Sequence, residues 1–331
     1  TINPKEDIAV LQYTGGTTGV SKGVMLSHYN LVSNVIQTDK FLGVNSARGK
    51  ERILNVLPLF HVYGMTVSMN YNFYLQSTLY LVERFDAEEI LSIIQDEKIT
   101  MFPGTPTIYV SVINIEKITD YDLSSIHLCI SGSSPLSVET KRTFEKLTGA
   151  KLVDAYGLSE ASPVTHSNPV IGVQKPGSMG VPIPGTDCKI VDAEDGITEL
   201  EINEPGELIV KGPQVMNGYW NRPDETADAL RDGWLYTGDI AYMDKDGYCF
   251  IVSRKKDVII ASGYNIYPRE IEEVLYEHPA VSEAVVYGVP HSYRGETVQA
   301  SIVLKKEYTN QIDEDTIIDY CKGKLAAYKI P

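Results

Sequence analysis

The sequence predicts an α/β fold in which a doubly wound, mostly parallel sheet is followed by a β-barrel-like part and then by a small α+β domain. Three observations carry this prediction. Short apolar runs alternate with helical patterns up to about residue 156, turn signals then separate short β-rich runs, and a new helical pattern follows the basic run RKKD. The expected divisions are a large domain at 1–253, with its α/β part at 1–171 and its β-rich part at 172–253, and a small mobile domain at 254–331.

In the first part of the chain, up to about residue 156, predicted strands alternate with predicted helices. Asp86 is a candidate N-cap, because an aspartate side chain can accept a backbone N–H at the start of a helix. Strand–helix–strand order makes successive strands parallel, and ligands of such sheets bind at the carboxyl ends of the strands. The segments ISGSSP and DAYGLSE each end a strand, so they are candidates for a ligand site. The expected strands are 52–58, 77–82, 126–131 and 151–157, and the expected helices are 65–75, 86–99 and 137–147.

The second half of the chain has a different pattern, in which turn signals separate short strands. The turn signals IPGTD, NEPGE, RDGW and DKDGY break it into short strands, with one helical insert at RPDETADALR. After RKKD, Pro268 opens a helix, a position where the missing N–H of proline costs nothing. Two strand candidates, SEAVVYGV and TVQASIVL, and a helix at DEDTIIDYCKGKLAA complete the predicted α+β unit.

Composition excludes several classes of protein. The 331 residues include 44 acidic and 29 basic side chains, which give a formal net charge of −15. A surface this acidic argues against a general binder of nucleic acid or anionic membranes. The four cysteines form no C-x-x-C pair, so they predict buried thiols of a reducing compartment and neither a disulfide framework nor a zinc site. No apolar run reaches transmembrane length and no leader is present, so we expect a soluble, cytoplasmic protein.

The stretch YTGGTTGVSKG near the amino end has the composition of a phosphate cradle. Glycines let backbone N–H groups converge, hydroxyls add donors, and Lys22 adds a cation. In a P-loop, lysine directly follows the last glycine, whereas here Gly19 and Lys22 are separated by Val20 and Ser21. The spacing therefore counts against a P-loop NTPase, and a plain polar loop between strand and helix stays the simpler alternative for this stretch alone.

This loop is the first of six motifs. The others are PLFHVYG (58–64), DAYGLSE (154–160), GELIVKGPQVMNGYW (206–220), DGWLYTGD (232–239) and RKKDVIIASGYNIYPREIE (254–272). In these motifs and their order, the sequence resembles the adenylate-forming superfamily of acyl-CoA synthetases, firefly luciferase and peptide synthetase adenylation domains. The run from Asp232 to Glu272 is most similar to long-chain fatty acyl-CoA ligases.

The resemblance implies an acid–thiol ligase that uses ATP, Mg²⁺ and coenzyme A. A carboxylate attacks the α-phosphate of ATP to give an acyl-adenylate and pyrophosphate, and coenzyme A then displaces AMP. Both steps concentrate negative charge, which calls for hydrogen-bond donors and a metal ion instead of a protein nucleophile. The implied partners are small molecules, with no nucleic acid and no transmembrane segment. Membrane contact and oligomeric state stay undecided.

The resemblance also assigns roles to single residues. Glu160 matches the carboxylate that helps to hold Mg²⁺, Asp239 the residue that binds both ribose hydroxyls, and Arg254 a further ribose or phosphate contact. His61 matches a positioning residue beside the acyl carboxylate, and Lys256 falls at the hinge before the small domain. The other assignments are Thr14, Gly15, Gly16, Thr17, Thr18, Gly19 and Lys22 for the β- and γ-phosphates, Ser159 for phosphate, Gly132, Ser133, Ser134, Ala155 and Tyr156 for the adenine slot, and Gly263 for the pantetheine tunnel.

Gly157 bears on the acyl substrate. Acetate-activating relatives have tryptophan at the matching place, so glycine predicts an open pocket for a medium or long acyl group. A flat aromatic acid, as in coumarate-type CoA ligases, would fit as well. Alternatives from other classes are a P-loop NTPase and a non-catalytic nucleotide-binding fragment.

The two ends of the chain, Thr1 and Pro331, both look cut from something longer. The resemblance places the adenylation lysine beyond the segment LAAYKIP, and neither Lys324 nor Lys329 matches it. We therefore expect an internal fragment with weak or absent adenylation on its own.

Overall fold

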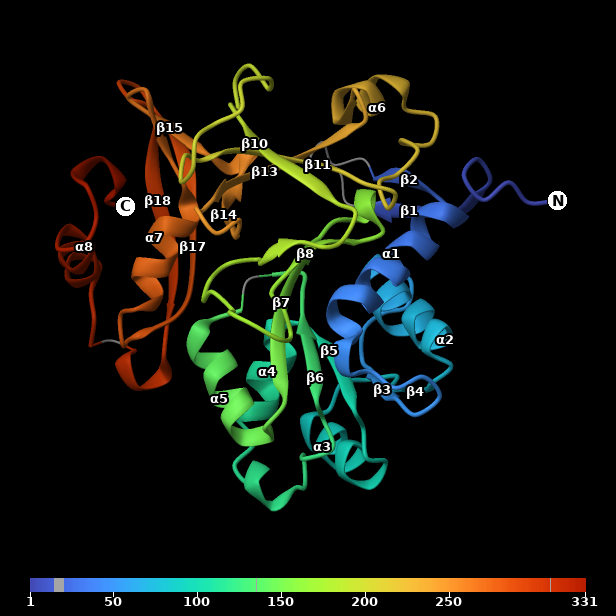
Figure 1. The fold of residues 1–331 in the computed structure, drawn as a ribbon. Coiled ribbons are helices and arrows are strands. Elements are labelled where there is room, and N and C mark those ends of the chain that lie inside the picture. Colours follow the sequence, from blue (N-terminus) through green and yellow to red (C-terminus); the bar gives the residue numbers. More distant parts are fainter. Residues whose placement is uncertain (15–20, 135, 310) are drawn as a thin grey trace. The chain divides into compact units, whose positions relative to one another are not determined.

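The structure, a computed structural model, describes residues 1–14, 21–134, 136–309 and 311–331 (Figure 1). The chain divides into two compact units. The first comprises Thr1–Lys189, Ile209–Thr237 and Met243–Phe250, and the second comprises Ile190–Leu208, Gly238–Tyr242 and Ile251–Pro331. The β-rich part therefore contributes residues to both units.

A seven-stranded sheet forms the centre of the first unit. Its first five strands are parallel, and the last two continue it in antiparallel fashion. This arrangement confirms the predicted doubly wound, mostly parallel sheet. The strand order is β4 (Thr78–Leu81), β3 (Arg52–Asn55), β5 (Met101–Gly104), β6 (Leu128–Ser131), β7 (Lys151–Gly157), β8 (Val164–Ser167) and β9 (Val181–Pro182).

Helices cover both faces of the parallel strands because successive strand residues are apolar on both sides. Ile53 packs in the same core as helices α1 (His28–Leu42) and α2 (Tyr71–Leu75). Its neighbour Leu54 packs in the core that contains residues of α3, α4 and α5 (Figure 1). The bounds of these three helices are Ala87–Asp96, Pro106–Ile113 and Val138–Thr148.

Local sequence signals explain where several of these helices begin. The Asp86 side chain accepts the backbone N–H of Glu89 at 3.0 Å, which confirms it as the N-cap of α3. The predicted helix at 65–75 is present but opens as a π-helix, Gly64–Asn70, before α2 continues it. A π-helical turn shifts the side chains that follow it relative to an unbroken α-helix, and such turns are frequent at functional sites.

Two smaller sheets complete the part of the chain before residue 255. Strands β1 (Ile8–Thr14) and β2 (Lys22–Ser27) pair with each other. A five-stranded sheet follows, with helix α6 (Pro223–Ala229) between two of its strands in the sequence. Its members are β10 (Asp187–Val191), β11 (Gly206–Lys211), β13 (Trp234–Met243) and β12 (Leu230–Arg231) in that order, with β14 (Cys249–Arg254) beside β13.

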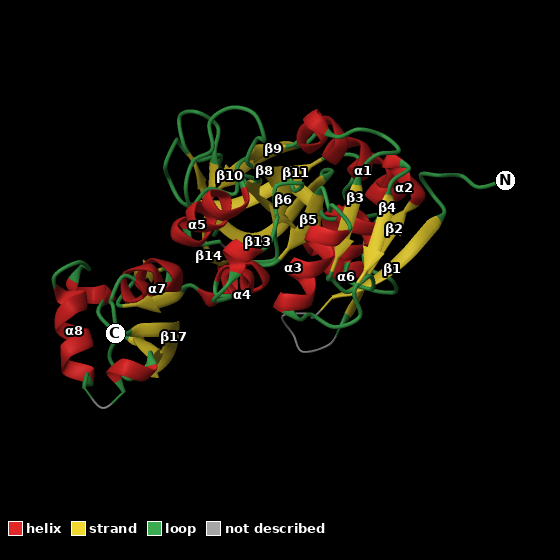
Figure 2. Ribbon diagram, turned by 90° about the horizontal axis from the view of Figure 1, so that it is seen from below, coloured by secondary structure: helices red, strands yellow, loops and turns green. Residues whose placement is uncertain are grey.

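The last part of the chain folds as the predicted α+β unit (Figure 2). Pro268 is the first residue of helix α7 (Pro268–Tyr276), as its sequence position predicts. Helices α7 and α8 (Glu314–Lys322) pack in one apolar core with a four-stranded sheet. The strand order is β16 (Tyr264–Ile266), β15 (Ile259–Ala261), β18 (Gly295–Leu304) and β17 (Val281–His291).

A buried carboxylate, Glu51, ties the start of β3 to its neighbours. The side chain is 4% exposed and accepts the backbone N–H of Ala47 at 2.7 Å. Its second oxygen lies 2.9 Å from His127 Nε2 and also accepts the Thr100 hydroxyl. Burial raises the pKa of Glu51, but the hydrogen bonds from His127, Thr100 and Ala47 outweigh burial and leave the pKa below its ordinary value.

Glu51→Gln is expected to lower the free energy of unfolding of the first unit by about 1–3 kcal/mol near neutral pH, because it removes charge-assisted hydrogen bonds. A carboxyl with a lowered pKa stabilises the fold above its ordinary value of 4.5 and loses that contribution as the pH falls through the lowered value. The difference between wild type and Glu51→Gln should therefore shrink below pH 4.5. Urea unfolding at neutral and acidic pH measures it.

The matched control is Glu97→Gln, which removes a half-exposed carboxylate paired with Arg52. Its cost should stay below about 1 kcal/mol. A pH-independent effect of Glu51→Gln would contradict this account of Glu51.

Candidate active site

The glycine- and threonine-rich loop connects two strands. β1 and β2 run antiparallel, and their last pair is Thr14 with Lys22. Helix α1 begins only at His28, after β2. A P-loop runs from a strand directly into a helix, so the described ends of this loop do not have that arrangement. The assigned residues Gly15, Gly16, Thr17, Thr18 and Gly19 lie outside the described residues.

The motif that ends in MNGYW lies against β2. The Trp220 N–H donates to the Gly23 carbonyl at 2.8 Å, and the Met25 N–H donates to the Gly218 carbonyl at 2.9 Å. These two bonds fix Tyr219 between them. Lys22 Nζ lies 5.0 Å from the centre of the Tyr219 ring, within the range of a cation–π contact.

Tyr219 links the loop to Glu160. Its hydroxyl donates to Glu160 Oε1 at 2.8 Å, and the Met216 N–H donates to the Glu160 backbone carbonyl at 2.8 Å. Burial raises the pKa of Tyr219 strongly, and the adjacent Glu160 charge raises it further, so the hydroxyl stays a neutral donor. The fold thereby brings Lys22, Tyr219 and Glu160 together, although they come from three motifs. Tyr219 carried no role in the sequence assignments.

Glu160 suits a hard metal ion such as Mg²⁺. It belongs to a short 3₁₀ turn, Ser159–Ala161, that directly follows β7. Within the described parts of the chain, Tyr219 occupies Oε1 and no side chain or backbone group bonds to Oε2. Mg²⁺ is commonly held by one or two carboxylates together with substrate phosphates and water, so one free carboxylate oxygen fits that chemistry.

The segment SGSS (131–134) lies next to a buried tyrosine. The Tyr63 hydroxyl donates to the Ile130 carbonyl at 2.7 Å, and a Cβ on Gly132 would come within 3.2 Å of the Tyr63 ring. Ser133 then has a φ of 73°, in the left-handed region that favours glycine, and both Ser133 and Ser134 are exposed. These contacts hold the loop after β6 at the carboxyl edge of the sheet, where the sequence places the adenine slot.

His61 lies just before Tyr63, on the surface. Its Nδ1 accepts the Tyr63 N–H at 3.2 Å, so the ring is oriented by the backbone of the same motif. Phe60, the residue before His61, is bound to strand β1, because the Gln12 side chain donates to the Phe60 carbonyl at 3.0 Å. His61 is therefore exposed and oriented, which are the properties that a positioning residue requires.

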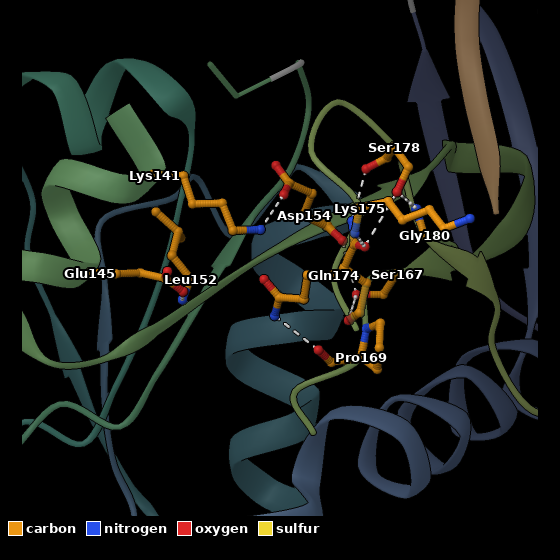
Figure 3. A network of polar contacts seen from close by, with 11 residues as sticks. Lys141, Glu145, Leu152, Asp154, Ser167, Pro169, Gln174, Lys175, Ser178 and Gly180 are labelled. Atoms are coloured by element: carbon orange, nitrogen blue, oxygen red, sulfur yellow. Dashed lines mark hydrogen bonds and ion pairs between the residues drawn. The ribbon is translucent and has the colours of Figure 1, made fainter. Parts of the chain in front are cut away.

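The DAYG segment runs through the end of β7. Ala155 pairs with Ser167 and Tyr156 with His166 on the neighbouring β8, and the Tyr156 and His166 rings meet edge to face at 5.9 Å. Asp154, one residue earlier, faces Lys141 of α5 at 2.8 Å (Figure 3). Burial raises the pKa of the Asp154 carboxyl, although Lys141 partly offsets this.

A cavity of about 310 Å³ lies beside this ion pair, within the first unit. Figure 3 shows Gln174 and Lys175 of the neighbouring loop close to Asp154. Leu136, just before α5, lines the cavity. The other lining residues come from α5, β7 and this loop and are Val138, Lys141, Arg142, Glu145, Lys151, Asp154, Gly172, Gln174, Pro176 and Gly177.

Gly157 does not face open space. A Cβ at this position would lie 2.1 Å from the Pro163 carbonyl oxygen and 3.1 Å from Val164 Cα. Those are backbone atoms, which cannot move aside as the end of a side chain can. The structure therefore gives Gly157 a backbone role, and the expectation that it opens an acyl pocket finds no support in this geometry.

Gly157→Ala is expected to destabilise the first unit by at least about 2 kcal/mol, because the added methyl group forces the β7 and β8 backbones apart. Thermal unfolding followed by circular dichroism measures this. Gly323→Ala is the control, since a Cβ there meets its nearest atom at an ordinary 3.6 Å. If the two variants unfold alike, the close approach at Gly157 is not the constraint described here.

Asp239 and Arg254 form an ion pair in the second unit. Asp239 Oδ1 lies 2.7 Å from Arg254 Nε, and the aspartate is almost fully buried whereas the arginine is half exposed. Glu207 holds Gly238, the residue before Asp239, because its Oε1 accepts the Gly238 N–H at 3.1 Å. Its Oε2 accepts a hydrogen bond from Lys255 Nζ at 2.7 Å. The structure thus brings together the two assigned ribose-site residues and adds Glu207, which the sequence did not single out.

The remaining assignments lie in the same unit. Lys256 is exposed in a 3₁₀ turn, Lys255–Asp257, directly after β14. Gly263 has a φ of 82° in the two-residue turn between β15 and β16, and a Cβ there would meet nothing within 4 Å. Lys324 pairs with Glu277 and Lys329 pairs with Glu270.

Taken together, the fold and the order of the motifs define an α/β protein of the adenylate-forming class. The sequence profile of the AMP-binding enzyme family matches residues 1–220, and that of the AMP-binding enzyme C-terminal domain matches residues 270–331. The chain belongs to the AMP-binding enzyme family.

Curated relatives agree with this assignment. The chain is 54% identical over 330 residues to a long-chain-fatty-acid–CoA ligase of Bacillus subtilis, which covers 100% of this chain and 58% of that protein. It is 40% identical over 327 residues to the enzyme of the same name from an Escherichia coli O6:H1 strain, covering 98% and 57%. The chain therefore spans a little more than half the length of these relatives.

Solved structures share the fold. ATP-bound MatB from Rhodopseudomonas palustris is 36% identical with a TM-score of 0.93, covering 99% of this chain and 64% of that one. The o-succinylbenzoate CoA synthetase of Bacillus subtilis with its acyl-adenylate is 32% identical with a TM-score of 0.87 and covers 99% of this chain. Among the described residues, no helix is both long and apolar enough to cross a membrane.

Proposed function

We propose that this chain carries the nucleotide-binding part of an AMP-forming ligase that joins a long-chain fatty acid to coenzyme A. The observation that carries the proposal is the contact of Lys22, Tyr219 and Glu160, which places a cation at the end of the loop and a carboxylate next to one another. The curated relatives named above support the choice of a fatty acid.

In this function Lys22 and Glu160 hold the phosphates of ATP. Lys22 faces the phosphates with its charge, and Glu160 accepts a metal ion on the oxygen that Tyr219 leaves free. When bound, Mg²⁺ neutralises charge that develops on the phosphate oxygens. Tyr219 orients the carboxylate through its hydrogen bond to Oε1 and holds Lys22 against its ring.

Asp239 binds the ribose. A buried carboxylate with two acceptor oxygens can take hydrogen bonds from both ribose hydroxyls, and the ion pair with Arg254 holds the side chain in place. Tyr156 covers the adenine face, while Gly132, Ser133, Ser134 and Ala155 line the slot and Ser159 donates to a phosphate. His61, which is exposed and held by the Tyr63 N–H, positions the acyl carboxylate.

Coenzyme A is used in the second half-reaction by the small domain at 254–331. Lys256 is the hinge residue at its start, and the open space around the Gly263 turn admits the pantetheine arm. The large domain at 1–253 supplies the adenylation site.

The test is acid-dependent exchange of labelled pyrophosphate into ATP, measured on the complete gene product that contains this chain. Exchange is expected with long-chain fatty acids, and AMP release should follow when coenzyme A is added. Aromatic acids of coumarate type serve as the matched panel, and a preference for them would replace the fatty acid with an aryl acid. Nucleotide hydrolysis without any acid, or ATP binding without exchange, would overturn the ligase proposal.

A further inference from the structure

Three side chains with metal-binding chemistry meet in the first unit, and none of them has a role assigned above. They are His166 on β8, Cys188 on β10 and Cys249 at the start of β14. One ligand atom of each side chain lies within 4.8 Å of the ligand atoms of the other two. In the parts of the chain that the structure describes, this is the single such group of three histidine, cysteine or acidic residues.

The backbone around the cluster is held on two sides. Gly180 and Cys249 form an antiparallel bridge, with Cys249 N–H donating to the Gly180 carbonyl at 2.9 Å. Two residues further on, Pro182 pairs with His166 in the ladder between β8 and β9. The segment 180–182 therefore pairs with the strand of the histidine and with the strand of one cysteine. This pairing brings His166 and Cys249 close together.

The cluster contains a buried polar atom without a partner. His166 is fully buried, and its Nδ1 lies 3.0 Å from the Thr165 hydroxyl. Its Nε2 is also buried and has no hydrogen-bond partner among the residues that the structure describes. Buried polar atoms are nearly always hydrogen-bonded, so the ring lacks an interaction that a bound ion would provide.

Two thiols and an imidazole form a ligand set for thiophilic metals. Sulfur and nitrogen ligands suit Zn²⁺, whereas Mg²⁺ and Ca²⁺ require oxygen ligands. With bonds of about 2.3 Å to sulfur and about 2.0 Å to nitrogen, tetrahedral ligands lie roughly 3.5–3.8 Å apart. Atoms that already lie within 4.8 Å of one another need to close by at most about 1.3 Å. Cys188 is only partly buried, which gives an ion access from solvent.

We propose that His166, Cys188 and Cys249 bind one thiophilic divalent metal ion of the zinc type, with the fourth position open to water. This site is separate from the Mg²⁺ position proposed at Glu160 and has no ligand in common with it. The His166 ring also contacts Tyr156, so metal binding fixes the ring that stands behind the proposed adenine slot. That last consequence depends on the proposed function, whereas metal binding itself does not.

Cobalt spectroscopy tests the site directly. The reduced chain, stripped of metal and kept free of oxygen, is titrated with Co²⁺. We expect sulfur-to-cobalt charge-transfer absorption and intense four-coordinate visible bands that saturate at one equivalent and disappear when Zn²⁺ is added. Absorption without a sulfur band, or no saturation, would overturn the proposal.

Cysteine variants assign the ligands. Cys188→Ser and Cys249→Ser should each weaken Zn²⁺ binding by more than about tenfold and remove intensity from the sulfur band. Cys321→Ser is the matched control, because Cys321 is a buried free cysteine in the second unit, outside the cluster. Equal loss in all three variants, or in none, would contradict the assignment.

A second measurement on the unaltered chain guards against misfolded variants. Alkylation by iodoacetamide is mapped by mass spectrometry with and without one equivalent of Zn²⁺. Zn²⁺ should protect Cys188 and leave the Cys321 rate unchanged. If Cys188 and Cys249 instead resist alkylation until a reductant is added, in the absence of metal, they form a disulfide and the metal proposal is wrong.

Discussion

Asp239→Asn is expected to weaken the binding of ATP and AMP by at least about a hundredfold, because it removes two charge-assisted hydrogen bonds to ribose at roughly 1.5–3 kcal/mol each. Asparagine keeps the size of the side chain but has one acceptor oxygen instead of two, and its NH₂ group faces the hydroxyl donors. It also leaves Arg254 without the carboxylate that lies 2.7 Å away. Calorimetric titration with each nucleotide measures the loss.

The control for Asp239→Asn is Asp319→Asn in the same unit. Asp319 is an exposed carboxylate that pairs with Lys322 at 2.8 Å, so it matches the chemistry of Asp239 without its burial. Its replacement should leave nucleotide affinity unchanged within about twofold. Pyrophosphate has no ribose, so its affinity should not change in Asp239→Asn. If a folded Asp239→Asn protein binds AMP as tightly as wild type does, Asp239 does not bind ribose.

The alternating sheet could be predicted because its signal is local. Ile53 and Leu54 are neighbours in the chain and enter opposite cores, so a run of apolar residues already indicates a strand covered on both faces. Strand β5 escaped prediction for a reason that is also local. Its sequence MFPG contains Pro103, which normally excludes a central strand, yet Pro103 lies opposite Ile130 in the parallel ladder.

The site was predictable as a set of motifs but not as a set of contacts. Glu160 and Lys22 were assigned by resemblance, whereas Tyr219, which contacts both, lies in another motif, far from them in the sequence, and that motif does not reveal the contacts. Glu207 is missed in the same way, because its role is to accept the N–H of Gly238 next to Asp239. Such supporting residues depend on which segments the fold brings side by side.

Gly157 and the cysteines are further cases in which the sequence does not reveal which segments the fold brings together. The missing side chain of Gly157 predicted an open pocket, but the space is filled by the Pro163 backbone, which no pattern around residue 157 reveals. The four cysteines lack metal-ligand spacing, and that spacing argued against zinc. Cys188 and Cys249 nevertheless meet beside His166, because the sheet brings distant strands together. Sequence spacing does not reveal that proximity, and whether the three side chains bind a metal ion is the proposal made above.

Glu160→Gln is expected to lower acid-dependent pyrophosphate exchange by at least about a hundredfold, comparable to the loss of one group that stabilises transition-state charge. Glutamine has the same shape and can still accept the Tyr219 hydrogen bond, so the fold should not change. Its neutral amide oxygen is a poorer ligand for Mg²⁺, so the Mg²⁺ concentration that gives half-maximal exchange should rise. Exchange rates over a range of Mg²⁺ concentrations, measured on the complete gene product, check both effects.

Tyr219→Phe separates the two roles that Glu160 could have. It removes the 2.8 Å hydrogen bond to Glu160 and keeps the ring that lies 5.0 Å from Lys22 Nζ. The loss of one hydrogen bond, about 0.5–1.5 kcal/mol, lowers exchange about tenfold or less and leaves the Mg²⁺ dependence nearly unchanged. If Tyr219→Phe is instead as damaging as Glu160→Gln, and both respond equally to Mg²⁺, then Glu160 acts by holding Tyr219 in place and is not a metal ligand.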